Sequence, residues 1–347
     1  MPRHARRHLN PVHDLPDHAI RALLQNPDNV RDLMEEAAPE LAPHLDFARM
    51  RIVQRDFALD DWRERQNDLF LVIPYRDPDH RPLLICILIE HQSKSDPAMP
   101  IRMFCYAVLY WEKRWKTWAD RKPRPKHLRL PTVLGVVYYT GSSPWSGPRS
   151  LGEMLDGPAA LIRKSPQWDL HFLELRSRQP EEWAEDPRPW WTAMAVLRGE
   201  RVGGVRFQQV FARVLHRLEA LCPQDRVRCE DLTRFNLALA QRRRGPGEME
   251  TLREVALASQ EEAVHRRRML SMWNVVKGSW EEEVLKRGEA RGTLNARREA
   301  LQFLLSDRFG PLPESVLARL QQADDPEQLW VALQQIPHLG DLSEFRL

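Results

Sequence analysis

The sequence has few cysteines and no long hydrophobic run. Its four cysteines, Cys86, Cys105, Cys222 and Cys229, are scattered without a CxxC pair, which argues against a disulfide framework or a zinc site. The longest apolar run, 83–89, is far too short to span a bilayer, and no apolar segment follows the basic N-terminal residues. We therefore predict no membrane segment and no secretory signal, and we expect a protein of the reducing cytoplasm.

The chain also has little net charge. Its 52 lysines and arginines nearly balance 49 aspartates and glutamates, which leaves a formal net charge of +3. Global charge thus gives weak support for a polyanionic partner, and the local distribution of charge must carry that argument. The 12 tryptophans and 11 phenylalanines indicate a folded protein. A length of 347 residues exceeds what one compact core usually holds and predicts more than one domain.

Hydrophobic periodicity predicts a mixed N-terminal half. One or two helices are expected over 13–38. A helix over 97–118 should begin at Asp96-Pro97 and carry an apolar face that includes Val108 and Trp115; its tryptophans are typical of a core or an interface. Strands are expected at 50–57, 67–75, 82–90 and 132–139, with an additional edge strand at 169–176.

The C-terminal half is predicted to be helical. A helix, a Gly-Pro turn and a second short helix are expected near the end of the chain, and Gly288 and Gly292 indicate a flexible joint before this terminal module. The expected helical segments are 189–199, 206–221, 230–243 and 250–300, and the segment 322–336 closes the module.

The candidate functional residues flank a predicted hairpin formed by the second and third strands. A loop centred near Asp79 would place Asp68 directly opposite Glu90, and Gln92 would project from the same strand face as Glu90. Two carboxylates that close repel each other unless one is protonated or a cation lies between them. Oxygen ligands of this kind suit Mg²⁺ or Mn²⁺. The spacing predicts a metal site suited to hydrolysis, with solvated strand ends as the alternative.

Segments of this region resemble a known family, that of the recombination-promoting nucleases and YhgA-like transposases, which belongs to the PD-(D/E)XK nuclease superfamily. The resemblance covers roughly residues 13–200. It is carried by HDLPDHAIRALLQNPDNVRDLM, RERQNDLFLVIPY, PLLICILIEHQSKSDPAMPIRMFCYAVLYW and LPTVLGVVYYTG. Near the C-terminus, SDRFGPLPESVLARL is similar to a short helical module (DUF4351-like) that is often joined to such proteins.

The resemblance implies an α/β protein. A restriction-endonuclease-like mixed sheet flanked by helices would occupy residues 13–185. A helical region would follow over 186–285, and a small helical C-terminal module over 286–340.

The resemblance also implies Mg²⁺-dependent cleavage of DNA, with Mn²⁺ as an alternative ion. Asp68 and Glu90 would bind the metal, and Gln92 would position the attacking water. The chain departs twice from the superfamily pattern, because Asn67 stands where proline is usual before the aspartate and Gln92 stands where lysine is more common. Glutamine can orient water but carries no charge, so Lys94, two residues further on, is a candidate for the missing cation.

Other residues near the hairpin are candidates for accessory or DNA-binding roles. Arg102 would hold a DNA phosphate near a helix N-terminus, with Tyr106 one turn further along. Asp14 would approach as an accessory acid, although a simple N-cap is the alternative. Lys113 and Arg121 belong to a basic stretch, 113–129, which is suited to tracking a phosphate backbone.

Two functions therefore remain open from the sequence. The first is a metal-dependent DNA endonuclease that promotes recombination and is related to transposases. The second is a catalytically weak DNA-binding or protein-interaction factor on a nuclease-like scaffold. In the second case, the helices beyond residue 187 would mediate homo-oligomerisation or regulation.

Overall fold

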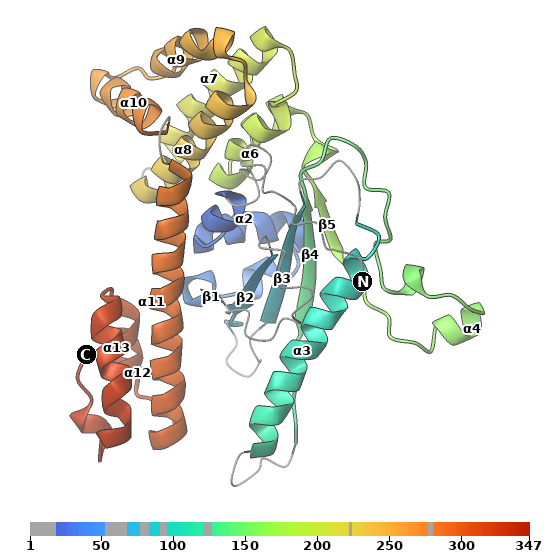
Figure 1. The fold of residues 1–347 in the computed structure, drawn as a ribbon, viewed down its shortest axis with the longest axis vertical. Helices are drawn as coiled ribbons and strands as arrows, with labels where there is room; N and C mark the ends of the chain where they lie inside the picture. Colours follow the sequence, from blue (N-terminus) through green and yellow to red (C-terminus); the bar gives the residue numbers. More distant parts are fainter. Residues whose placement is uncertain are drawn as a thin grey trace, which may run out of the picture.

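A five-stranded mixed sheet forms the centre of the N-terminal half (Figure 1). The computed structural model describes residues 19–52, 68–76, 83–90, 96–120, 127–221, 224–276 and 280–347, and for Asp68 and most of the third strand it describes the backbone alone. The strands lie side by side in chain order. Their bounds are β1 Arg51–Ile52, β2 Asp68–Ile73, β3 Leu83–Glu90, β4 Val133–Tyr139 and β5 His171–Glu174.

Pairing within the sheet changes from antiparallel to parallel. β2 pairs antiparallel with both β1 and β3, whereas β3, β4 and β5 run parallel to one another. Parallel neighbours need a crossover connection, and helix α3 (Met99–Asp120) supplies it between β3 and β4. The strands predicted at 67–75, 82–90, 132–139 and 169–176 and the helix between the second and third of these are thus confirmed, with bounds displaced by a few residues. Of the strand predicted at 50–57, β1 confirms residues 51–52, and residues 53–57 lie outside the described residues.

Both faces of the sheet are covered, which explains why its strands read as continuous apolar runs. Leu69 and Leu71 of β2 belong to the larger core, together with the helices on one side of the sheet. Phe70 and Val72 face the other side and pack in a second cluster with residues of α3. Figure 1 shows α3 against this second face, continuing beyond the ends of the strands.

Helix α3 buries a different face from the apolar face that the sequence predicted. Met99, Met103 and Tyr106 are buried against the sheet, whereas Val108 and Trp115 are 43% and 50% exposed. The helix is apolar on two sides, so periodicity alone could not tell which side meets the sheet.

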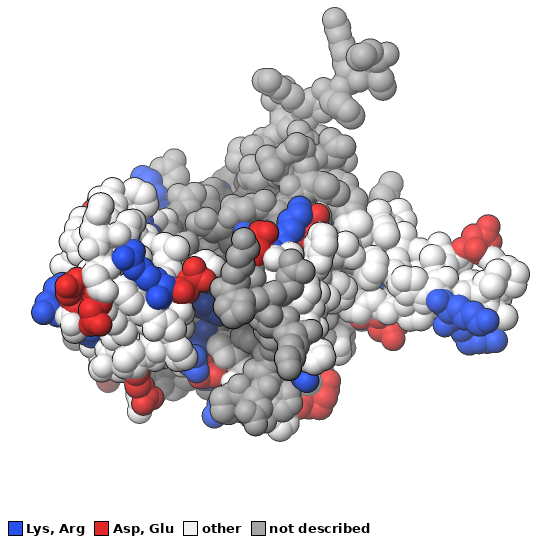
Figure 2. Space-filling view, turned by 90° about the horizontal axis from the view of Figure 1, so that it is seen from below, with Lys and Arg blue, Asp and Glu red and all other residues white. Residues whose placement is uncertain are grey.

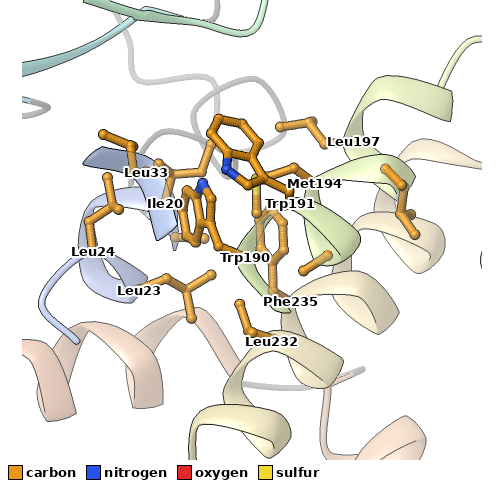
Figure 3. Packing of buried hydrophobic residues seen from close by; sticks show 14 of the residues in the cluster. Ile20, Leu23, Leu24, Leu33, Trp190, Trp191, Met194, Leu197, Leu232 and Phe235 are labelled. Carbon is orange, nitrogen blue, oxygen red and sulfur yellow. The ribbon is translucent and has the colours of Figure 1, made fainter. Parts of the chain in front are cut away.

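The larger core is one cluster of buried residues, and its members come from segments between Ala19 and Val276. Figure 3 shows Trp190 between Leu23 and Leu24 near the N-terminus and Leu232 of α8. The segment expected to form a separate region after residue 185 therefore packs into the same core as the sheet. The helices involved are α2 Pro27–Ala37, α5 Pro180–Ala184, α6 Pro189–Gly199, α7 Gly204–Leu221, α8 Arg226–Arg243, α9 Met249–Ala258 and α10 Ala263–Val276.

The C-terminal module has a core of its own, formed by α11 (Trp280–Phe309), α12 (Glu314–Gln322) and α13 (Pro326–Gln335). Gly310, at a φ of 82°, ends α11, which confirms the predicted turn. The flexible joint expected at Gly288 and Gly292 is wrong, because both glycines lie inside the continuous helix α11. The predicted helical stretch 250–300 is divided among α9, α10 and α11.

Short helical turns connect the longer elements. They are η1 Ala42–His44, η2 Phe47–Arg49, η4 Gly152–Met154, α4 Ala159–Ile162, η5 Leu175–Ser177, η6 Pro246–Glu248, η7 Ile336–His338 and η8 Leu342–Glu344. Across the described residues, no helix combines the length and the apolar character that a bilayer crossing requires.

A buried ion pair fastens α2 to α8. The guanidinium of Arg228 donates to the Asp32 carboxylate at 2.5 Å and to Asn29 Oδ1 at 2.8 Å, and the Trp190 backbone N–H also donates to Asp32, at 3.0 Å. Both charged side chains are 9% exposed. Burial raises the pKa of Asp32, and Arg228 opposes that rise.

We predict that Arg228→Met lowers the free energy of unfolding by about 3–5 kcal/mol, because it leaves the Asp32 carboxylate buried without its partner. Arg226→Met, at an exposed position of the same helix, should change it by less than about 0.5 kcal/mol. Urea denaturation measures both.

The deficit of Arg228→Met should shrink as the pH falls through the raised pKa of Asp32, because the folded protein then holds the carboxyl in its neutral form. Equal stability of the two variants at neutral pH would refute this role for the pair.

Candidate strand-end metal site

The observed register of the hairpin differs from the predicted one. Asp68 pairs with Leu88, not with Glu90, because Ile73 pairs with Leu83 and the connecting segment is centred one residue earlier than expected. The prediction of direct opposition is therefore wrong. A shift of two residues in the pairing leaves every residue on its original face, since side chains alternate with a period of two.

Asp68 and Glu90 nevertheless share one face and one end of the sheet. Asp68 alternates with Phe70, whose ring meets Tyr106 of α3 edge-on with centroids 4.9 Å apart. Glu90 is in register with Tyr139, which belongs to the same cluster as Phe70. Both acidic positions thus lie on the α3 face, as diagonal neighbours, a relation in which residues are typically about 7–8 Å apart.

Apart from Arg102, the remaining predicted site residues divide into two groups, those that the structure describes and those that it does not. Tyr106 is buried against Phe70 and supports the sheet, and Lys113 is exposed on α3. The predicted site residues that lie outside the described residues are Asp14, Gln92, Lys94 and Arg121.

Arg102 is buried at the start of α3. Its Nη1 donates to Asp96 Oδ2 at 2.7 Å, and its side chain is 7% exposed. Asp96 also accepts from the Ala98 backbone N–H at 2.9 Å, which fixes the first turn of the helix. In this structure Arg102 is therefore an internal ion-pair partner, and its expected contact with a DNA phosphate stays a prediction.

Sequence reasoning missed a third acidic residue in this row. Parallel pairing aligns Glu90 with Tyr139 and Tyr139 with Glu174, so three neighbouring strands end at the same level. The signal was available, because Glu174 falls within the predicted edge strand, but its alignment depended on an unknown register. The carboxylate of Glu174 pairs with Arg149 and lies 3.9 Å from Arg176 Nη1.

The loop after β4 folds back over this strand end. Trp145 packs edge-on against Tyr139 with ring centroids 5.4 Å apart, and its backbone N–H donates to Glu174 at 3.4 Å. Arg149 lies over the ring of Phe172, 4.7 Å from its centroid. The loop therefore holds one aromatic side chain, Trp145, and one cationic side chain, Arg149, beside the strand end that carries the acidic row.

Gly141 is required for this close approach. A Cβ at Gly141 would lie 2.3 Å from the ring of Tyr139, which is fully buried. We predict that Gly141→Ala lowers the free energy of unfolding by about 1–3 kcal/mol through overpacking. Gly203→Ala is the matched control, because a Cβ there meets nothing within 4 Å. Thermal denaturation of both variants is the measurement, and equal midpoints would contradict the proposed packing.

A search for further acidic, histidine and cysteine clusters covers only the described side chains, which do not include those of Asp68 and Glu90. Within the part of the chain whose side chains can be placed, no group of three or more His, Cys, Asp or Glu residues could hold a metal ion. Charges are also mixed on the face seen in Figure 2, where acidic and basic residues alternate over the C-terminal module and basic side chains gather near α4. The metal site at the strand end with Asp68 and Glu90 stays a prediction from the sequence.

Comparison with known proteins identifies the family. The family model described as "Putative transposase, YhgA-like" matches residues 13–223, more than half of the chain. The chain belongs to this YhgA-like family. The matched segment contains the whole sheet, α3 and the strand-end site, whereas α8 and all helices after it lie beyond the match.

A curated relative of this YhgA-like protein is the recombination-promoting nuclease RpnD of Escherichia coli O157:H7. The two are 28% identical over 134 residues, which is 38% of this chain and 48% of the relative. The chain thus aligns with about half the length of that relative. No solved structure matches the chain significantly.

Proposed function

We propose that this YhgA-like protein is a Mg²⁺-dependent DNA endonuclease that promotes recombination. The observation that carries the proposal is the placement of Asp68 and Glu90 on one face and at one end of the sheet. Family membership and the likeness to a protein named as a recombination-promoting nuclease support it.

The order of elements supports a restriction-endonuclease-like core. A helix precedes three strands with antiparallel neighbours, and a long helix then crosses over to a parallel fourth strand. Acidic residues at the start of β2 and at the end of β3 would then occupy the metal-binding positions that the superfamily resemblance implies.

The donor set suits a hard divalent ion. Two carboxylates on adjacent strands are ligands that Mg²⁺ and Mn²⁺ accept, and together they repel each other unless a cation or a proton intervenes. Asp68 and Glu90 would hold the ion, which when bound stabilises charge on a phosphoryl oxygen and lowers the pKa of water. Gln92 would orient the attacking water by hydrogen bonding, and Lys94 would supply positive charge.

DNA would be held by cations outside the metal site. Lys113, Arg114 and Lys116 are exposed on the C-terminal half of α3, and Arg121 follows in the adjoining segment. Exposed lysine and arginine side chains bind phosphates without regard to base sequence, so this stretch would position the duplex. Arg149 and Arg176, beside the acidic row, are additional candidates for contacts with phosphate.

A catalytically weak DNA-binding or protein-interaction factor is the alternative function. Two observations favour it: Gln92 stands where a lysine is more common, and the register places Asp68 opposite Leu88 instead of Glu90. On this alternative the protein would retain the scaffold and bind DNA without cutting it.

A plasmid-nicking assay distinguishes the two functions. We predict cleavage with Mg²⁺ or Mn²⁺ and none with EDTA. Asp68→Asn and Glu90→Gln should each reduce the rate more than about 100-fold, because losing a direct metal ligand should exceed the 10–100-fold effect of losing an outer partner.

Asp156→Asn, which removes an exposed carboxylate, is the matched control and should cut at the wild-type rate. Metal-dependent cutting that survives both site substitutions would overturn the proposed site. Binding without cutting in either metal would instead support the alternative function.

A further inference from the structure

Helix α3 has a second apolar face that the described chain leaves open. Ile101, Val108 and Trp115 are 36%, 43% and 50% exposed, and they lie on the side of the helix opposite Met103 and Tyr106, which are buried. Exposed apolar residues that gather along one side of a helix, instead of being scattered singly, mark an interaction surface. The outer face of α3 therefore has the composition of a contact surface.

The spacing of this face is that of a helix–helix seam. Apolar residues follow the a and d positions of a heptad over nearly the whole helix. The d side is partly covered by the chain itself: Phe104 lies 6.0 Å from the ring of Trp168, and Trp111 Nε1 donates to the Pro131 carbonyl at 2.9 Å. The a side is the exposed one. The a residues are Ile101, Val108 and Trp115, and the d residues are Phe104, Trp111 and Trp118.

We propose that the outer face of α3 binds the same face of a second copy of this chain, in an antiparallel arrangement about a two-fold axis at Val108. Ile101 and Trp115 lie seven residues before and seven residues after Val108. A two-fold axis at Val108 therefore places the Ile101 of each copy against the Trp115 of the other. Each smaller side chain meets a larger one, and the surface is complementary to itself, as an isologous interface requires.

The distribution of charge along α3 favours the antiparallel orientation. Its exposed cations, Lys113, Arg114 and Lys116, all lie in the C-terminal half. The only charged residue between Met99 and Trp111 is Arg102, which is buried and paired with Asp96. Glu112, which pairs with Lys116, and Asp120 leave the C-terminal half of α3 with a formal net charge of +1. An antiparallel pair keeps these two halves at opposite ends, whereas a parallel pair would place their like charges side by side.

The same distribution argues against DNA as the occupant of this stripe. A polyanion is held by cations, and Ile101, Val108 and Trp115 offer none. The cations at the C-terminal end of α3 are exposed, so DNA could contact them while the apolar stripe contacts the second copy. The proposal does not depend on the nuclease activity.

The size of the seam predicts a reversible dimer. Twenty-two residues make a helix about 33 Å long, so a strip about 10 Å wide covers about 330 Å². Leu128 and Leu130, 36% and 42% exposed, extend the apolar surface beside Trp111 through the neighbouring Pro131. Stable interfaces bury about 800 Å² per partner, so a seam of this size predicts a weak dimer that forms only at high protein concentration.

Sedimentation velocity on the full-length chain tests the proposal, over concentrations from about 1 to about 100 μM. Wild type should shift from monomer to dimer across this range. Val108→Glu should weaken association at least tenfold, because the axis brings the two introduced carboxylates together, and Val108→Lys should do the same. An equimolar mixture of the two variants should recover the dimer, because opposite charges then meet at the axis.

Val227→Glu is the matched control, since Val227 is an exposed valine on α8, and its association should equal that of wild type. Circular dichroism establishes that each variant is folded. Three outcomes would overturn the proposal: wild type that stays monomeric throughout, a dimer that Val108→Glu leaves unchanged, or a mixture of folded variants that fails to associate. A dimer insensitive to position 108 would place the contact elsewhere, for example on the C-terminal helices.

Discussion

The alternation of side chains along β2 is the constraint on which the site depends. Leu69, Leu71 and Ile73 are buried in the larger core on one side of the sheet. Asp68, Phe70 and Val72 must therefore lie on the other side, the side that α3 covers. Turning Asp68 to the opposite face would move the whole apolar set of the strand out of its core, so the free energy of burial fixes the position of the acidic residue.

The sequence was sufficient for the features that follow from local periodicity. Strand positions, the crossover helix and the shared face of Asp68 and Glu90 depend on the apolar pattern alone, and all were predicted. The pairing partner of Asp68 was not, because the centre of the hairpin loop depends on loop geometry that the apolar pattern does not specify. The alignment of Glu174 with Glu90 was missed for a related reason, since parallel register is set by packing across two crossovers.

Two further errors show where tertiary context overrides local signals. Gly288 and Gly292 each weaken a helix by about 1 kcal/mol relative to alanine, yet α11 continues through both. Helix α3 carries apolar residues on two sides, so the sequence could not say which side meets the sheet. In the structure the inner side supports the strands that carry Asp68 and Glu90, and the outer side is available to a second chain. In the proposed dimer, the helix would link the strands that carry Asp68 and Glu90 to the second copy.

The proposed function depends on Asp68 and Glu90 jointly binding a divalent ion. Electron paramagnetic resonance of Mn²⁺ measures this without any assay of cleavage, because protein-bound Mn²⁺ loses the sharp signal of the free aqueous ion. Titration of the wild-type chain should show Mn²⁺ binding that excess Mg²⁺ displaces, and Asp68→Asn and Glu90→Gln should each abolish it. Undiminished Mn²⁺ binding in both folded variants would show that Asp68 and Glu90 do not bind the ion.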